Sequence, residues 1–376
     1  MVLSRQCFFW YATSMRSFRV AILAPLKRAI TTDTTISRNR VIVDLVTELT
    51  ARGHRISIFG TGGSHLPGVE FVPIVPKPLV DMPPAENDFY QHTSYLTLMI
   101  AEALKRQGEF DLIHNHMYPE YLALYAPFTT PMVTTVHSQM IELTASVLKQ
   151  FPQANLVAIS HMAKKMAGID SMDVVHNSVD TDFFRSSDGS KDYLLAVGRM
   201  SKAKDDQGNF SDPKGITTAI KIAQATGEHL KIVGNVEDPK FFETLVKPQL
   251  SDKIEFVAEV SAEQKMTREQ MRDLFAGAKA FINPINWEEP FGLVMAEALS
   301  CGTPVVAYNR GAVSEIVENG KVGFVVPPEA GVDGFVNALK HIGSIDRATC
   351  RTHAVTHFSI KRMVDQYEAV YEKIIV

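Results

Sequence analysis

The sequence predicts an α/β protein with two doubly wound, Rossmann-like domains in tandem. Strand-like apolar runs alternate with helical patterns along almost the whole chain, which is typical of parallel α/β sheets. The alternation breaks at the short, polar, glycine-containing segment 185–191 and then restarts. The length of 376 residues is also more than one ordinary domain needs.

In the first half, 18–25 is a buried first strand, and 41–51 has apolar residues at helical spacing. The next strand follows at 55–60. We therefore expect an N-terminal, acceptor-side domain over 18–184, preceded by a poorly ordered extension over 1–17. Its remaining predicted strands are 110–116, 132–138, 155–160 and 172–180.

After the linker 185–191, the second domain is expected over 192–356 and binds the nucleotide sugar. The last segment, 357–376, has the pattern of an amphipathic helix and is expected to pack back on the N-terminal domain. The predicted strands are 193–199, 230–234, 253–260, 280–285, 304–308 and 323–328, and the predicted helices are 216–226, 268–278 and the segment from 290 onward.

Composition removes several classes of function. A net charge of −4 gives no reason to expect a nucleic-acid partner, and no apolar run has the length of a membrane span. The three cysteines are far apart and fit a reducing, cytoplasmic setting. Neither first strand is followed by GxGxxG, and GxxxxGK[ST] is absent, which disfavours dinucleotide oxidoreductases and P-loop kinases.

The segment WEEPFGLVMAEALSCGTP (287–304) suggests the chemistry. Pro290 suits a first helical position, so the following N–H groups would form an anion site at a helix start. Glu289 stands before this helix, and Glu297 lies inside it among apolar neighbours, where a carboxylate needs partners. Two carboxylates flanking a diphosphate suit a sugar nucleotide. In the alternative interpretation, Glu289 is a helix-start charge and Glu297 is solvated.

The segment 280–328 resembles the E-x7-E region of retaining GT-B glycosyltransferases of the family-four type, also called glycosyl transferases group 1. The resemblance extends from about Phe18 to the C-terminal helix. It implies that Glu289 contacts the donor sugar hydroxyls and that Glu297 binds the ribose. It also implies that the backbone of Phe291, Gly292 and Leu293 faces the sugar and phosphates.

The resemblance assigns two cations to the diphosphate. Arg199, at the end of a strand, and Lys214, in PKGI, fit the family pair, although the link between them is longer than usual. Lys204 is the alternative lysine, and we prefer Lys214 because its sequence continues directly into the helix 216–226. His137 matches a strand-end histidine facing the donor sugar. We add Gly234, at the end of 230–234, to the donor-binding residues.

The acceptor side is sought at His116 and in the loop 26–40. The loop is basic through Lys27, Arg28, Arg38 and Arg40, and it carries Ile36 and Ser37 where relatives often have two glycines. Such a loop suits an anionic acceptor or a peripheral contact with the membrane surface, whereas a solvated loop is the alternative.

No essential metal and no other cofactor is expected. His114 and His116 form an HxH pair without an evident third ligand. Asp180 and Asp182 form DTD, but Asp180 falls in a segment that resembles the family's NGVD and is interpreted as structural or cleft-lining.

The expected function is metal-independent transfer of a hexose from a nucleoside-diphosphate sugar to a hydroxyl acceptor, with retention of configuration. Two alternatives stay open: an epimerase-like enzyme on the same architecture, and a non-catalytic sugar-nucleotide-binding protein. The base, the sugar and the acceptor are not specified by the sequence.

Overall fold

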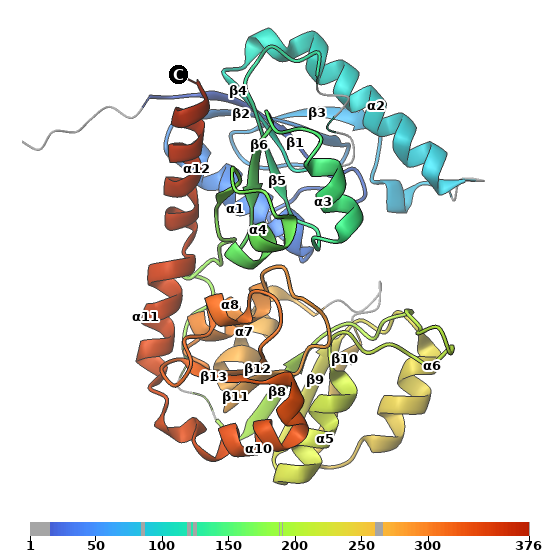
Figure 1. Cartoon of the computed structure of the whole chain (residues 1–376), viewed down its shortest axis with the longest axis vertical. Coiled ribbons are helices and arrows are strands. Elements are labelled where there is room, and N and C mark those ends of the chain that lie inside the picture. Colours follow the sequence, from blue (N-terminus) through green and yellow to red (C-terminus); the bar gives the residue numbers. More distant parts are fainter. Residues whose placement is uncertain are drawn as a thin grey trace, which may run out of the picture.

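A computed structural model describes residues 16–83, 87–118, 122, 126–187, 189, 191–259 and 266–375. These residues form two α/β domains, one above the other in Figure 1, each built on a parallel sheet with helices against it. The predicted fold class, two Rossmann-like domains, is confirmed. Of the predicted N-terminal extension, residues 1–15 lie outside the described residues.

The first sheet has the order β3-β2-β1-β4-β5-β6-β7, and all its pairings are parallel. Its central strands are buried on both faces, as expected for a sheet covered by helices. The strands are β1 Arg19–Leu23, β2 Arg55–Thr61, β3 Glu70–Val75, β4 Leu112–Asn115, β5 Met132–Val136, β6 Asn155–Ala158 and β7 Asp173–Val174. The helices are α1 Ser37–Ala51, α2 Asp88–Arg106, α3 Glu142–Leu148 and α4 His161–Ala167.

The second sheet repeats this plan in the order β10-β9-β8-β11-β12-β13, again parallel. Its strands are β8 Tyr193–Val197, β9 His229–Gly234, β10 Ile254–Glu259, β11 Ala280–Asn283, β12 Val305–Tyr308 and β13 Gly323–Val326. Its helices are α5 Ile216–Thr226, α6 Pro239–Phe241, α7 Arg268–Gly277, α8 Leu293–Ser300, α9 Val313–Ile316 and α10 Gly331–Lys340.

Both sheets reverse their strand order at an equivalent point, between β1 and β4 in the first and between β8 and β11 in the second. Ligands of open α/β sheets bind outside the carboxyl ends of the strands at such a point. The loops after these four strands are therefore where a ligand site is expected.

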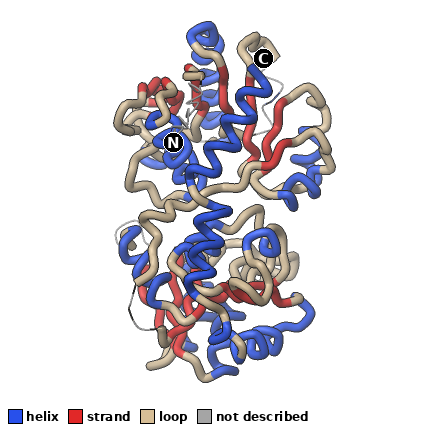
Figure 2. The backbone as a smooth tube through the Cα atoms, turned by 90° about the vertical axis from the view of Figure 1, so that its left-hand side faces the viewer, coloured by secondary structure: helices blue, strands red, loops and turns tan. Residues whose placement is uncertain are grey.

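Two helices in succession close the chain along one side of both domains (Figures 1 and 2). The first, α11 Arg347–Phe358, packs on α8 of the second domain. The second, α12 Ile360–Ile375, buries Tyr367 and Tyr371 in the core of the first domain. The chain between them is extended at Ser359. None of the helices in the described ranges combines the length and apolarity that a bilayer span requires.

The predicted final helix over 357–376 therefore needs correction, because residues 357 and 358 end α11 and the helix on the first domain begins at 360. The backbone N–H of Val179 donates to the Phe358 carbonyl at 2.8 Å, beside this break. Arg351 of α11 donates to the carbonyls of Thr181, Phe184 and Ser300. Hydrogen bonds thus join the segment that enters the second domain, residues 179–184, to the helix α11 that leaves it.

Candidate active site

A pocket of about 420 Å³ lies between the two domains. The first domain contributes the loops after β5, β6 and β7 and the start of α1, and the second contributes the loops after β8 and β11. Of the predicted site residues, those that line this pocket are His137, Arg199, Lys214, Glu289, Phe291, Gly292, Leu293 and Arg38. Those that do not line it are Glu297, Gly234, His116, Lys27 and Arg28.

Glu289 and Lys214 form an ion pair at this pocket. Their Oε2–Nζ distance is 2.7 Å, and both side chains are largely buried. The indole N–H of Trp287 also donates to Glu289 Oε2, at 3.1 Å. The Lys214 ammonium lies 4.6 Å from the centre of the Trp287 ring, a cation–π distance. The arrangement fixes one carboxylate and one cation side by side, facing the same space.

Of the two candidate lysines, Lys214 lines the pocket and Lys204 does not. Lys204 is exposed and lies over the Phe210 ring, away from the residues that line the pocket. Lys214 packs so closely on Gly198 that a Cβ on that glycine would lie 2.5 Å from the Lys214 Cβ. Although the link between Arg199 and Lys214 is longer than usual in the family, both side chains still line the same pocket.

Arg199 and Gly234 play different parts. The Arg199 side chain is 53% exposed and lies 3.6 Å from Glu237, so much of its guanidinium surface remains available to a ligand. Gly234 lies against the end of β8, where a Cβ would be 1.8 Å from the Gly198 carbonyl oxygen. Gly234 does not line the pocket and is instead a close-packing position between β9 and the end of β8.

The helix start differs from the prediction. Pro290 was expected at the first helical position, but α8 begins at Leu293, after Gly292 at φ +96°. The loop before it is held from the other side: Glu288 accepts from the Gly311 N–H at 2.6 Å, and the Glu289 carbonyl accepts from the Ala312 N–H at 2.9 Å. Glu289 is therefore on a braced loop, and the helical rise does not set its distance from Glu297.

Glu297 lies in a charged cluster between the domains. Its carboxylate has no hydrogen bond or ion pair with any described residue. Burial raises the pKa of Glu297 to about 7; the charge of Arg268 opposes the rise and that of Asp44 adds to it. Burial likewise raises the pKa of Asp44 to about 6, against the charge of Arg40. Arg268 also borders a second, larger interdomain pocket of about 950 Å³.

The raised pKa of Glu297 gives a pH-dependent expectation for stability. The native state binds a proton here that the unfolded chain has released, so this group destabilises the fold as pH rises from about 4.5 to about 7. Glu297→Gln should therefore raise the melting temperature at pH 8 but not at pH 4.5. Thermal unfolding at both pH values checks this, with the exposed Glu255→Gln as control. An equal effect of Glu297→Gln at both pH values would contradict it.

Three histidines lie at the ends of β4 and β5: His114 is in β4, His116 follows β4, and His137 follows β5. His114 is satisfied on both ring nitrogens, by the Tyr371 hydroxyl at 2.7 Å and the Thr135 hydroxyl at 2.8 Å. His116 Nδ1 lies 2.8 Å from His137 Nε2. Because His114 has no free nitrogen, these contacts argue against an HxH metal pair.

Burial lowers the pKa of both His116 and His137, and only His137 lines the pocket. Burial, together with the charge of Arg38, lowers the pKa of His116 to about 3. Burial lowers the pKa of His137 well below its usual value, and His116 and Arg38 add to the effect. His137 therefore meets the pocket as a neutral hydrogen-bonding group whose orientation is fixed by His116.

The basic loop is not uniformly available to an anion. Arg38 lines the pocket, and its guanidinium lies 5.1 Å from the Tyr118 ring centre. Arg28 borders the larger pocket, and Lys27 is exposed. Arg40, by contrast, is paired with Asp44 at 2.9 Å and donates to the Thr32 carbonyl. The predicted peripheral membrane contact of this loop stays a prediction.

The missing glycines do not remove backbone donors from this region. Helix α1 begins at Ser37, directly after Ile36, so it starts four residues earlier than the predicted 41–51. Ser37 and Arg38 are in its first turn, where N–H groups have no intrahelical acceptor, and both line the pocket. Asn39 donates to the Ala29 carbonyl and so anchors the loop.

Other residues complete the site. Asn177 lines the pocket, and its buried Oδ1 accepts no hydrogen bond in the described structure. Asp180 accepts from the Phe183 N–H and lies 3.9 Å from Arg268, in keeping with a structural role. Sequence reasoning assigned no role to Trp287, although this residue begins the quoted segment 287–304. It also missed Asp44, a buried charged residue among the apolar residues of α1.

Comparisons with known families cover most of the described chain. Residues 39–183 match the family described as Glycosyltransferase Family 4, and residues 191–344 match Glycosyl transferases group 1. A D-inositol 3-phosphate glycosyltransferase from Streptomyces scabiei is 27% identical over 338 residues, spanning 77% of this chain and 74% of the relative.

Solved structures share the architecture. Sucrose-phosphate synthase from Thermosynechococcus elongatus superimposes with a TM-score of 0.74 at 18% identity, covering 95% of this chain and 99% of the other. Anabaena HepE in complex with UDP-glucose gives 0.67 at 15% identity, covering 95% and 100%. At these identities the likeness concerns the fold.

Proposed function

Because the chain belongs to the GT-B glycosyltransferases of the family-four type, we propose that it transfers a hexose from a nucleoside-diphosphate sugar to a hydroxyl acceptor. We further propose that the reaction retains the anomeric configuration and needs no metal cofactor. The observation that carries this proposal is the Lys214–Glu289 ion pair on the interdomain pocket.

In the proposed reaction, Lys214 and Arg199 stabilise the negative charge that develops on the departing diphosphate. Positioned cations do this with little reorganisation during the reaction. Glu289, already held by Lys214 and Trp287, accepts hydrogen bonds from the donor sugar hydroxyls. The acceptor hydroxyl then attacks on the same face from which the diphosphate departs.

His137 and Glu297 would complete the donor site. Neutral His137 contributes one oriented hydrogen bond near the sugar. We place Glu297 at the ribose hydroxyls, although it does not line the pocket, because hydrogen bonds from them would satisfy a carboxylate that is otherwise costly to bury. Closure of the two domains over the donor would exclude water and limit hydrolysis.

A thermal-shift screen tests the donor side. UDP-glucose is the first ligand to try, because HepE was solved with it, and GDP- and ADP-sugars follow. A donor that binds the native state raises the melting temperature. Transfer assays with the responding donor then use phosphorylated and unphosphorylated polyols. Binding without transfer would contradict the enzyme assignment, and a donor epimer formed without an acceptor product would indicate an epimerase.

For the acceptor, we propose an anionic compound recognised by Arg38. This residue lines the pocket, and the Streptomyces scabiei relative is named for a phosphorylated polyol. Loss of one charged hydrogen-bonding partner should raise the acceptor KM about 10-fold in Arg38→Ala, with the donor KM little changed. Arg28→Ala, outside this pocket, is the matched control. Equal acceptor KM values in the two variants would refute this role.

A further inference from the structure

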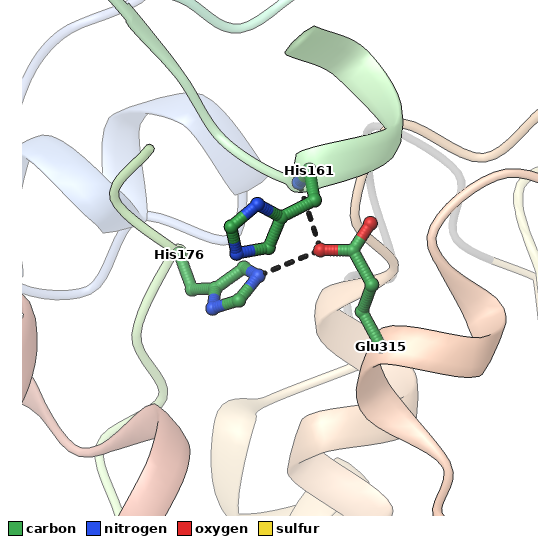
Figure 3. A group of neighbouring side chains, drawn as sticks. All are labelled: His161, His176 and Glu315. Atoms are coloured by element: carbon green, nitrogen blue, oxygen red, sulfur yellow. Dashed lines mark hydrogen bonds and ion pairs between the residues drawn. The ribbon is translucent and has the colours of Figure 1, made fainter. Parts of the chain in front are cut away.

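Two histidines of the first domain meet a glutamate of the second beside the pocket. His161 begins α4, His176 follows β7, and Glu315 lies on α9 (Figure 3). One ligand atom from each lies within 4.8 Å of the others. The three side chains come from separate elements and converge across the domain boundary.

Glu315 makes the hydrogen bonds that hold this group together. Glu315 Oε2 accepts from the His161 backbone N–H at 2.8 Å, and Oε1 accepts from the Met162 N–H at 2.7 Å. His176 Nε2 is 2.8 Å from Oε2, and both of these side chains are largely buried. These contacts hold the pKa of Glu315 below its usual value, against the effect of burial.

The His161 ring is differently placed. It is exposed, and no hydrogen bond or ion pair joins its nitrogens to any residue in the described ranges. Its centre is 5.6 Å from the His176 ring centre at an interplanar angle of 73°. Two ring nitrogens and one carboxylate oxygen therefore lie close together, and the ring nitrogen of His161 has no hydrogen-bond partner in the described ranges.

We propose that His161, His176 and Glu315 form a binding site for Zn²⁺ or a similar borderline divalent metal that links the two domains. Two imidazoles and one carboxylate suit such a metal, whereas Mg²⁺ and Ca²⁺ prefer all-oxygen sites. Zinc–ligand distances are about 2.0–2.2 Å, so the His176–Glu315 contact would widen slightly and His161 would close in. Water would take the fourth position.

The carboxylate is already oriented for this role. While Oε2 turns to the metal, Oε1 keeps the Met162 N–H, and such outer contacts support metal ligands. The cluster also adjoins the donor pocket, because the His176 ring centre lies 5.8 Å from that of Phe291, which lines it. A metal here would hold the domains together and slow the opening that product release requires.

Titration of the intact chain with ZnCl₂ in chelator-free buffer at neutral pH tests the site by calorimetry. We expect one zinc per chain with a Kd of about 1 μM or tighter. His161→Ala removes a ligand without breaking a hydrogen bond of the described structure, and should weaken binding at least about 10-fold. The exposed His341→Ala is the control and should bind like the wild type.

A second histidine pair allows a sharper test. His353 and His357 lie one turn apart on α11, with ring centres 4.7 Å apart. Zinc binding that survives His161→Ala but is lost in His357→Ala would overturn the proposal, as would no binding by the wild type.

Inhibition of sugar transfer by zinc is a separate readout. Unlike the binding titrations, this readout rests on the proposed function. Zinc should lower transfer by the wild type and not by His161→Ala. Equal inhibition of both proteins would overturn the link between this site and domain opening. A chain that binds zinc but transfers no sugar would refute the proposed function and leave the site standing.

Discussion

Lys214→Ala is expected to lower kcat/KM for the sugar nucleotide by about 10²–10³-fold, the size of effect seen when one positioned charge-stabilising group is removed. The variant loses the cation beside the diphosphate and also leaves Glu289 without its ion-pair partner. Lys204→Ala should leave kcat/KM nearly unchanged, because Lys204 is exposed and lies away from the pocket.

Steady-state kinetics with the donor identified by thermal shift measure this effect, and circular dichroism shows whether both variants are folded. The two lysines belong to the same loop region between β8 and α5, so they form a matched pair. A larger loss in Lys204→Ala than in Lys214→Ala would reverse the assignment of the phosphate lysine.

Gly311→Ala is expected to affect both stability and activity. Gly311 is at φ +60°, and a Cβ there would lie 2.2 Å from the Glu289 carbonyl oxygen. The left-handed conformation costs an alanine about 1–2 kcal/mol, and overpacking adds about 1–3 kcal/mol. Since relief of the clash moves Glu289, activity should also fall about 100-fold.

Gly320→Ala separates these two causes. Gly320 is also left-handed, at φ +77°, but nothing lies within 4 Å of its would-be Cβ. It should lose only the conformational part of the stability and keep its activity. Urea unfolding and donor kinetics on both variants provide the measurement. Similar losses of activity in the two would exclude the contact with Glu289 as the cause.

The fold was largely predictable because most strands are short apolar runs with clear turn signals. The predicted helix 216–226 coincides with α5. Strand β3 was missed because Pro73 interrupts its pattern, which is tolerated at the edge of a sheet. The strand predicted over 172–180 contains only β7, Asp173–Val174, because the chain then turns toward the second domain.

The site was predictable where its chemistry is local in sequence. Glu289, Phe291 and Gly292 were identified from one continuous segment, and all line the pocket. The start of α8 was misplaced because Gly311 and Ala312, distant in sequence, brace the preceding loop.

The availability of the loop cations was not predicted, because the sequence pattern placed the start of the first helix at residue 41 and left Arg40 in the loop. The sequence shows Arg40 as one more charge in a basic loop, whereas the fold pairs it with Asp44 and assigns Arg38 alone to the pocket. Arg40 is inside α1, where i,i+4 spacing brings it to Asp44, so the true start of the helix decides which cation remains available to a ligand.

The chain crosses between the two domains twice, near Val179 and at Ser359, and these two crossings lie side by side. They determine where the domains can turn relative to each other. Val179 and Phe184 belong to the core of the second domain, and Arg351 fastens this segment to α11. The segment 185–191, predicted as the linker, therefore follows residues that already belong to the second domain. Rotation has to bend the backbone just before Val179 and at Ser359, two points that are paired side by side. The two crossings are therefore one paired connection, so an opening motion has to bend both backbones at the same place.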